Sequence, residues 1–272
     1  MPDFQSLATA IEKRQIVELL ETERRLDGRD KTEFRPIKIQ TNIIKTAHGS
    51  ALVELGKTKV IAGVKAIMGR PYDDYPNKGS FTVGYESNPL AAPEYKLGPP
   101  REEAIEVARV TDRMIRESDC VNLEKLCLIE GEKAWQIFID IYPLDVNGNL
   151  VDAAAIAAFA ALSCAKIPEA KVNEEGEVEI LETFQPLELK AFPVSVTTFK
   201  IGDHFVVDGN LKEELISDAR ITFGTTDTHI VSAQKGGIEG IKSDKILEIL
   251  KTSIKVSADV REAIRSQIDI DL

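Results

Sequence analysis

The sequence GPPREEAIEVARVTDRMIR, residues 98–116, indicates how the fold is built. Its two prolines, Pro99 and Pro100, end the preceding segment. From Arg101 onward every residue is tolerated in a helix, and acids fill the first turn, where the helix dipole favours them. At about 100° per residue, apolar side chains occupy most of the circumference of this helix. We therefore expect a largely buried helix with a narrow polar strip.

Three arginines lie in that polar strip. Arg109, Arg113 and Arg116 follow one another at i, i+4 and i+7, so their guanidinium groups lie along one side of the helix. Like charges at this spacing repel one another, and a bound anion would relieve the repulsion. Alternatively, Glu102 and Glu106 pair with the arginines as a surface ion ladder, each pair contributing roughly 0.3–0.5 kcal/mol. The helix by itself is compatible with both interpretations.

Composition limits the possible functions. A chain of 272 residues can hold one large domain or two lobes with a real core. Its formal net charge of −11 argues against a free-standing nucleic-acid binder, because affinity for phosphate backbones comes from Lys and Arg. Any RNA contact must be local or shared with a partner.

The cysteines and the apolar runs indicate the compartment. Cys120, Cys127 and Cys164 lack metal-ligand spacing, which predicts buried thiols in a reducing cytosol. The N-terminus lacks a signal-type apolar core, and the one long apolar run, residues 150–165, is too short to span a bilayer. We expect a cytoplasmic protein with no membrane role.

The rest of the chain alternates sheet and helix. Residue patterns predict strands at 51–55, 59–66, 80–86, 125–129, 135–144, 194–199, 204–207, 219–223 and 228–233. Helical periodicity predicts further helices at 4–25, 151–165 and from an N-cap at Ser243 to about 268. A mixed linker is expected at 168–176. Residues 235–240 are expected to form a flexible turn, because they lack the Gly-Lys-Ser/Thr of a phosphate loop.

Several of these landmarks resemble one family. Arg25-Leu26-Asp27-Gly28-Arg29, Arg35-Pro36-Ile37 and the hairpin around Gly56-Lys57-Thr58 are similar to the start of ribonuclease PH-type phosphorolytic exoribonucleases. The proline-led arginine helix, the strand, turn and Ala-rich helix at 135–165, and the segment 211–222 resemble the non-catalytic ribonuclease PH-like subunit of the archaeal exosome. The likeness covers nearly the whole chain.

The resemblance implies a fold and an assembly. It implies a mixed α/β, ribonuclease PH-like fold with a left-handed βαβ unit, an exception to the usual handedness. The expected division is an N-terminal helix and arm (1–30), a first lobe (31–168) and a second lobe (169–272). It also implies a hexameric ring of three heterodimers with a catalytic sister subunit, a central channel for single-stranded RNA, and a cap of RNA-binding proteins.

The resemblance also assigns roles to residues. Arg109 and Arg113 match the exposed arginines that line the RNA path in the family, and Arg116 lies on the same strip nearer the helix end. The planar fork of arginine grips phosphate oxygens in pairs and stays charged. This favours RNA binding over the ion ladder for these three residues.

The catalytic features of the family are missing. Active members hold phosphate with a Gly-Ser/Thr-Arg loop before the Ala-rich helix, but here that loop is Asn147-Gly148-Asn149-Leu150, and no Lys or Arg occurs from 134 to 165. Active members also carry two aspartates six residues apart. Asp218 resembles the later one, and Lys212 stands at the earlier position, so Asp218 is expected to be a cap or turn acceptor.

We therefore expect a catalytically inactive subunit with no catalytic residue. It would complete the ring, support the catalytic partner and position RNA. The alternative is that the chain is itself an active phosphate-dependent 3′–5′ exoribonuclease. No cofactor or metal is expected, since Asp73 and Asp74, the one pair of adjacent loop acids considered, have no His or Cys nearby in the sequence.

Overall fold

The computed structural model describes residues 4–174 and 176–270. Groups of strands alternate with single helices along the chain. The strands are β1 Ile37–Thr41, β2 Gly49–Leu55, β3 Thr58–Gly69, β4 Ser80–Tyr85, β5 Cys127–Ile129, β6 Lys133–Asp145, β7 Lys166–Val172, β8 Val178–Pro186, β9 Val194–Ile201, β10 His204–Val207, β11 Ala219–Thr225 and β12 Ile230–Gly237. The helices are α1 Phe4–Glu21, α2 Glu102–Glu117, α3 Leu150–Ser163, α4 Leu211–Ile216 and α5 Ser243–Arg265, with a 3₁₀ turn at Glu124–Leu126.

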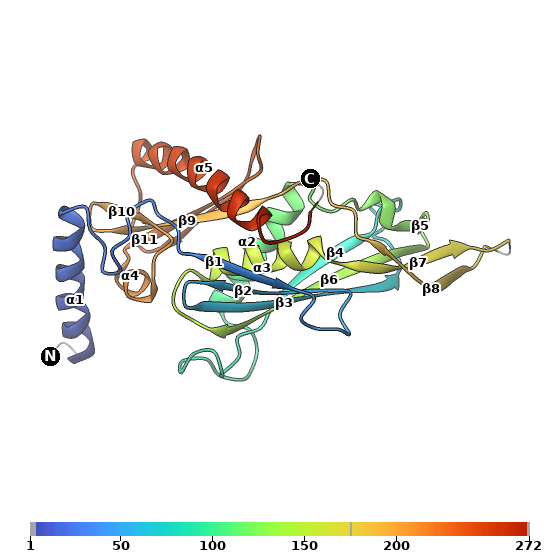
Figure 1. Cartoon of the computed structure of the whole chain (residues 1–272), viewed down its shortest axis with the longest axis horizontal. Coiled ribbons are helices and arrows are strands. Elements are labelled where there is room, and N and C mark those ends of the chain that lie inside the picture. Colours follow the sequence, from blue (N-terminus) through green and yellow to red (C-terminus); the bar gives the residue numbers. More distant parts are fainter. Residues whose placement is uncertain (1–3, 175, 271–272) are drawn as a thin grey trace.

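The strands form two sheets and a ribbon (Figure 1). The first sheet has the order β1-β2-β3-β6-β4, with β5 paired to β6, and the second has the order β10-β9-β11-β12. Strands β7 and β8 pair only with each other. In Figure 1 this ribbon projects at one end of the molecule and α1 lies at the other.

The first sheet contains a βαβ unit. Strand β4 is parallel to β6, in a register from Ser80↔Gln136 to Tyr85↔Ile141, and the chain passes through α2 between them. All other pairings of this sheet are antiparallel. The mixed α/β fold is thus confirmed, and the left-handedness of the unit stays a prediction.

Helix α3 lies at the centre of the core. Every side chain from Val151 to Leu162 is buried, and the helix packs against β2, β3 and β9, so both sheets cover it. A Cβ added at Gly49 would collide with the carbonyl of Ala161, which shows how closely β2 approaches the helix. The prediction of a helix that is apolar on all sides is confirmed.

Buried arginines fix the arm between α1 and β1. Arg25 donates to both carboxylate oxygens of Glu213, at 2.9 and 2.6 Å, and neither side chain is exposed to solvent. Arg35 binds Asp208 at 2.7 and 2.8 Å, and Arg29 binds the same carboxylate at 3.2 Å. Burial of these charges is tolerable because each carboxylate has a cationic partner. The charged motif at the start of the chain therefore joins the arm to the second sheet.

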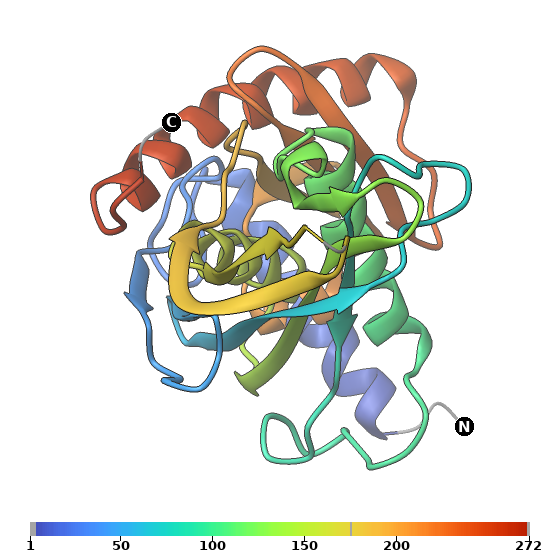
Figure 2. The same ribbon diagram turned by 90° about the vertical axis from the view of Figure 1, so that its right-hand side faces the viewer.

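The expected linker at 168–176 is wrong. Residues 166–172 form β7, which pairs with β8 in the ribbon that faces the viewer in Figure 2. Most side chains of β8 are exposed, so the strand has no buried face to produce the apolar alternation that sequence patterns detect. The expected lobe boundary after residue 168 falls inside β7, and the division into lobes stays a prediction.

Smaller corrections concern the ends of elements. Residues 124–126 form a 3₁₀ turn, so only 127–129 of the strand expected at 125–129 are extended. Residues 235–237 continue β12 instead of forming a flexible turn. Ser243 is the first residue of α5, whose N-cap is Lys242 with no side-chain capping bond, and this helix ends at Arg265.

Candidate functional site

Helix α2 places its arginines on the surface. Its apolar face is buried, through Ala104, Val107, Val110, Met114 and Ile115. The other side is more open than the sequence predicts, since Ile105 is 45% exposed. Arg109, Arg113 and Arg116 are all exposed, so the three predicted residues share one accessible strip.

The alternative ion ladder, in which Glu102 and Glu106 pair with the arginines of α2, does not form among the described residues. Among the described residues, Arg109 and Arg113 make no hydrogen bond or ion pair. Glu106 instead binds Arg220 of β11 at 2.6 Å. Two neighbouring guanidinium groups are therefore left with their charge uncompensated within the described chain, and an anion at this position would relieve their repulsion.

Arg116 differs from the other two arginines. It donates to Asp112 at 2.7 and 2.9 Å, and its guanidinium lies 4.2 Å from the centre of the Phe81 ring. The hydrogen bond to Asp112 raises the pKa of Arg116. Its charge is thus already paired, and it is less available to a phosphate than Arg109 or Arg113.

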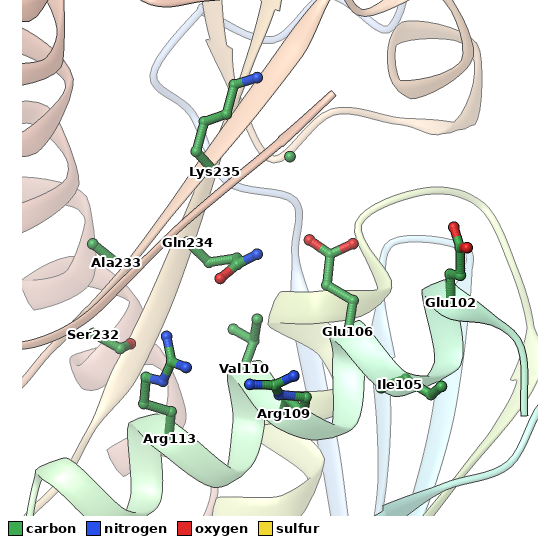
Figure 3. A pocket seen from close by; sticks show the side chains of 11 residues that line it. Glu102, Ile105, Glu106, Arg109, Val110, Arg113, Ser232, Ala233, Gln234 and Lys235 are labelled. Carbon is green, nitrogen blue, oxygen red and sulfur yellow. The ribbon is translucent and has the colours of Figure 1, made fainter. Parts of the chain in front are cut away.

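A groove of about 450 Å³ runs between α2 and β12 (Figure 3). In the figure Arg109 and Arg113 lie toward one end of the helical wall and Glu102 and Glu106 toward the other. This α2–β12 groove is lined by Glu102, Ile105, Glu106, Arg109, Val110, Arg113, Ser232, Ala233, Gln234, Lys235 and Gly236. A phosphate group would be attracted to the arginine end and repelled by Glu102 at the other end, where the charge of Glu106 is compensated by Arg220.

The turn before α3 already holds a carboxylate. The backbone N–H of Asn149 donates to Oε2 of Glu214 at 2.8 Å, and the Asn149 side chain donates to Asp152 and Asp208 at 2.8 and 2.6 Å. Burial raises the pKa of the Glu214 carboxyl, and the hydrogen bond from Asn149 opposes this shift. A free anion at this turn would meet three carboxyl groups from the chain itself.

One arginine reaches this turn from a distant part of the sequence. Arg35 donates to the carbonyl oxygens of Asn147 at 2.8 Å and Gly148 at 3.1 Å. Its charge is compensated by Asp208, as described above. Sequence reasoning missed this contact because it considered only residues 134–165, whereas Arg35 lies in the N-terminal arm.

Asp218 has the geometry expected of a turn acceptor. It accepts a hydrogen bond from the backbone N–H of Gly202 at 2.8 Å and forms an ion pair with Lys13 of α1. Lys212 lies 3.8 Å from Glu12, also in α1. These contacts join α1 to Asp218, which precedes β11, and to α4.

The other candidate residues bring no ligand site together. Asp73 pairs with the exposed Arg70 at 3.2 Å. Within the described ranges, no group of three or more His, Cys, Asp or Glu side chains could hold a metal ion. All three cysteines are free thiols, and only Cys120 is fully buried. Over the same part of the chain, no helix has the length and apolar character to cross a membrane.

Known proteins similar to this chain cover nearly all of it. The model of the 3′ exoribonuclease family, domain 1, matches residues 33–168, and that of domain 2 matches residues 191–256. A relative named exosome complex component Rrp42 from Pyrococcus horikoshii is 44% identical and covers 96% of each chain. The protein of the same name from Methanopyrus kandleri is 41% identical over 96% of this chain and 98% of its own.

Solved structures give the same fold. A chain of the Archaeoglobus fulgidus exosome with RNA bound to the active site superposes with a TM-score of 0.87 at 40% identity, covering 94% of this chain and 98% of that one. A chain of an archaeal exosome core superposes with a TM-score of 0.84 at 38% identity, covering 97% and 100%. Both likenesses therefore extend over nearly the whole chain.

Proposed function

Because the chain belongs to the 3′ exoribonuclease family, we propose that it is a non-catalytic ring subunit of an exosome that degrades RNA from the 3′ end. Relatives that match it over almost their whole length carry the name of an exosome component. The structures that it resembles are exosome cores, one of them with bound RNA. These likenesses favour the ring subunit over an independent enzyme.

The position of the Glu214 carboxylate is the main observation that supports our proposal that this subunit is inactive. Phosphorolysis requires inorganic phosphate beside the scissile bond and cations that stabilise the developing charge. At the turn before α3, the Glu214 carboxylate accepts the hydrogen bond from the backbone N–H of Asn149, and the charge of Arg35 is compensated by its ion pair with Asp208. Inorganic phosphate would have to displace the Glu214 side chain from this backbone N–H, and no unpaired Lys or Arg among the described residues at the turn would then bind it. We therefore propose that phosphate does not bind there.

RNA positioning is assigned to the arginine strip. Arg109 and Arg113 are exposed and unpaired among the described residues, so each can bind a phosphodiester without first breaking an ion pair. Arg116 is a third contact with a smaller contribution, because Asp112 competes for its guanidinium. The chain thus supplies local positive charge although its net charge is −11.

The remaining chemistry belongs to a partner. We assign phosphate binding and cleavage to a catalytic ribonuclease PH-like subunit, three copies of which alternate with this chain in a hexameric ring. RNA-binding cap proteins deliver single-stranded RNA to the channel, and the complex works in the cytoplasm without a cofactor bound by this chain.

The test compares the chain alone with the assembled ring. The purified chain, given single-stranded RNA and inorganic phosphate, should release no nucleoside diphosphates. Co-expression with the catalytic partner should produce a ring that releases them. Phosphate-dependent release by the isolated chain would support the alternative of an active exoribonuclease and contradict the proposal.

A further inference from the structure

We propose that Gln234 and Ser232, on the β12 wall of the α2–β12 groove, bind the base and ribose of an RNA nucleotide whose phosphate is held by Arg109 and Arg113. This inference rests on the proposed RNA-binding function. It adds a base contact from the second sheet, on the wall opposite the arginines.

The polar groups of this wall lack partners. Ser232 is only 9% exposed and Gln234 is half-buried, yet neither side chain forms a hydrogen bond with any residue in the described ranges. Figure 3 shows the Gln234 amide directed into the space between β12 and α2. Both groups line the open groove, so each can bind a ligand there without first breaking a hydrogen bond within the protein.

The two walls differ in a way that suits a nucleotide. The helical wall presents two uncompensated guanidinium groups, and the strand wall presents a neutral amide and a hydroxyl. The groove volume of about 450 Å³ is in the range of small-ligand sites, roughly 300–1,000 Å³. A nucleotide has the same division between a charged phosphate and a neutral base and sugar.

Other charges around the groove limit where a phosphate can lie. Lys235 also belongs to β12, but its ammonium donates to the carbonyl of Gly237 at 2.7 Å and points away from the arginines in Figure 3. At the far end, the exposed Glu102 would repel phosphate, whereas the charge of Glu106 is compensated by Arg220. The phosphate is therefore restricted to the arginine end, which leaves the base nearest Gln234.

The amide of Gln234 determines which base is preferred. A primary amide carries a donor and an acceptor side by side and can pair bidentately with N6 and N7 of adenine. Unstacked bases of single-stranded RNA expose these edges to side chains. We therefore expect this position to favour adenine over uracil.

The experiment measures RNA affinity of the assembled ring in phosphate-free buffer, which prevents cleavage. Fluorescence anisotropy with oligo(A) and oligo(U) at several salt concentrations gives the base preference and the salt dependence. Gln234→Ala and Gln234→Glu should each lower the affinity for oligo(A) roughly fivefold or more. In the Gln234→Ala variant, the dependence of oligo(A) affinity on salt concentration should stay the same, because no charge is removed. Arg113→Ala should weaken both oligomers and flatten the slope by about one unit.

Lys235→Ala is the matched control, because it alters the same strand, while the Lys235 ammonium is bound by the carbonyl of Gly237 and is directed away from the arginines. It should leave the preference for oligo(A) intact. If Arg113→Ala weakens binding but the Gln234 variants keep the full oligo(A) preference, the base contact is overturned and the proposed function stands. If Arg113→Ala has no effect on either oligomer, the proposed function itself fails.

Discussion

The ion pair between Arg25 and Glu213 joins residues 188 positions apart and has no exposure to solvent. Arg25→Ala would leave the Glu213 carboxylate buried without its partner, and we expect a loss of about 3–5 kcal/mol in the free energy of unfolding. Urea denaturation measures this loss. The control is Arg14→Ala, which removes an exposed pair with Glu18 and should change stability by less than about 0.5 kcal/mol. Equal effects would show that the buried pair does not stabilise the fold.

Asp152 is a buried carboxyl on α3 whose effect depends on pH. It accepts hydrogen bonds from Ser195, Thr197 and Asn149, but burial raises its pKa to about 6. In the unfolded chain it ionises at a lower pH, so the folded state loses stability as pH rises from about 4 through about 6.

Asp152→Asn should remove this dependence. Relative to the variant, wild type should gain on the order of 2 kcal/mol in unfolding free energy as pH falls from 7 to 4. Thermal denaturation at both pH values gives the comparison. A difference between the two proteins that does not change with pH would contradict the raised pKa of Asp152.

At the scale of elements, the turn from β6 to α3 depends on Gly148. Its φ is +86°, and a Cβ there would lie 2.5 and 2.6 Å from backbone atoms of Asn210 and Leu211. We expect Gly148→Ala to destabilise the fold by more than about 1 kcal/mol. Gly63→Ala is the control, because a Cβ in the middle of β3 meets nothing within 4 Å. A chemical-denaturation midpoint that shifts equally in both variants would refute the proposed strain.

Elements whose residues form a regular pattern could be predicted from sequence. The apolar run of α3 and the hairpin of β2 and β3 are examples, because burial imposes the helical or strand period on them. The ribbon could not be predicted in this way, since β8 has little buried surface. Neighbouring charges along α2 suggested pairing with Glu106, but tertiary structure placed Arg220 closer.

The candidate site was predictable only in part. The spacing of Arg109 and Arg113 located one wall of the groove, because residues four apart share a helix face. Gln234 lies more than a hundred residues later, and no local pattern connects it to α2. The contact between Glu214 and Asn149 joins two elements that are likewise distant in sequence. The sequence shows that no Lys or Arg lies near the turn before α3 along the chain, but it does not show that the Glu214 carboxylate is bound at this turn.

At the scale of the whole molecule, we propose that RNA positioning and phosphate chemistry are carried out by different subunits. Positive charge is retained in the α2–β12 groove of a chain with a net charge of −11. The turn before α3 is occupied by Glu214. If the chain binds the RNA substrate of a catalytic partner, as proposed, its variants should alter the KM for RNA more than kcat.

The most direct test measures phosphorolysis by the ring across a range of RNA concentrations, with wild-type chain and with Arg109→Ala/Arg113→Ala. Lys251→Ala/Lys255→Ala, which removes the same charge from exposed positions four residues apart on α5, is the control. We predict that the arginine variant raises the KM for RNA at least about tenfold with little change in kcat, while the control resembles wild type. Equal activity of all three rings at every RNA concentration would contradict the account.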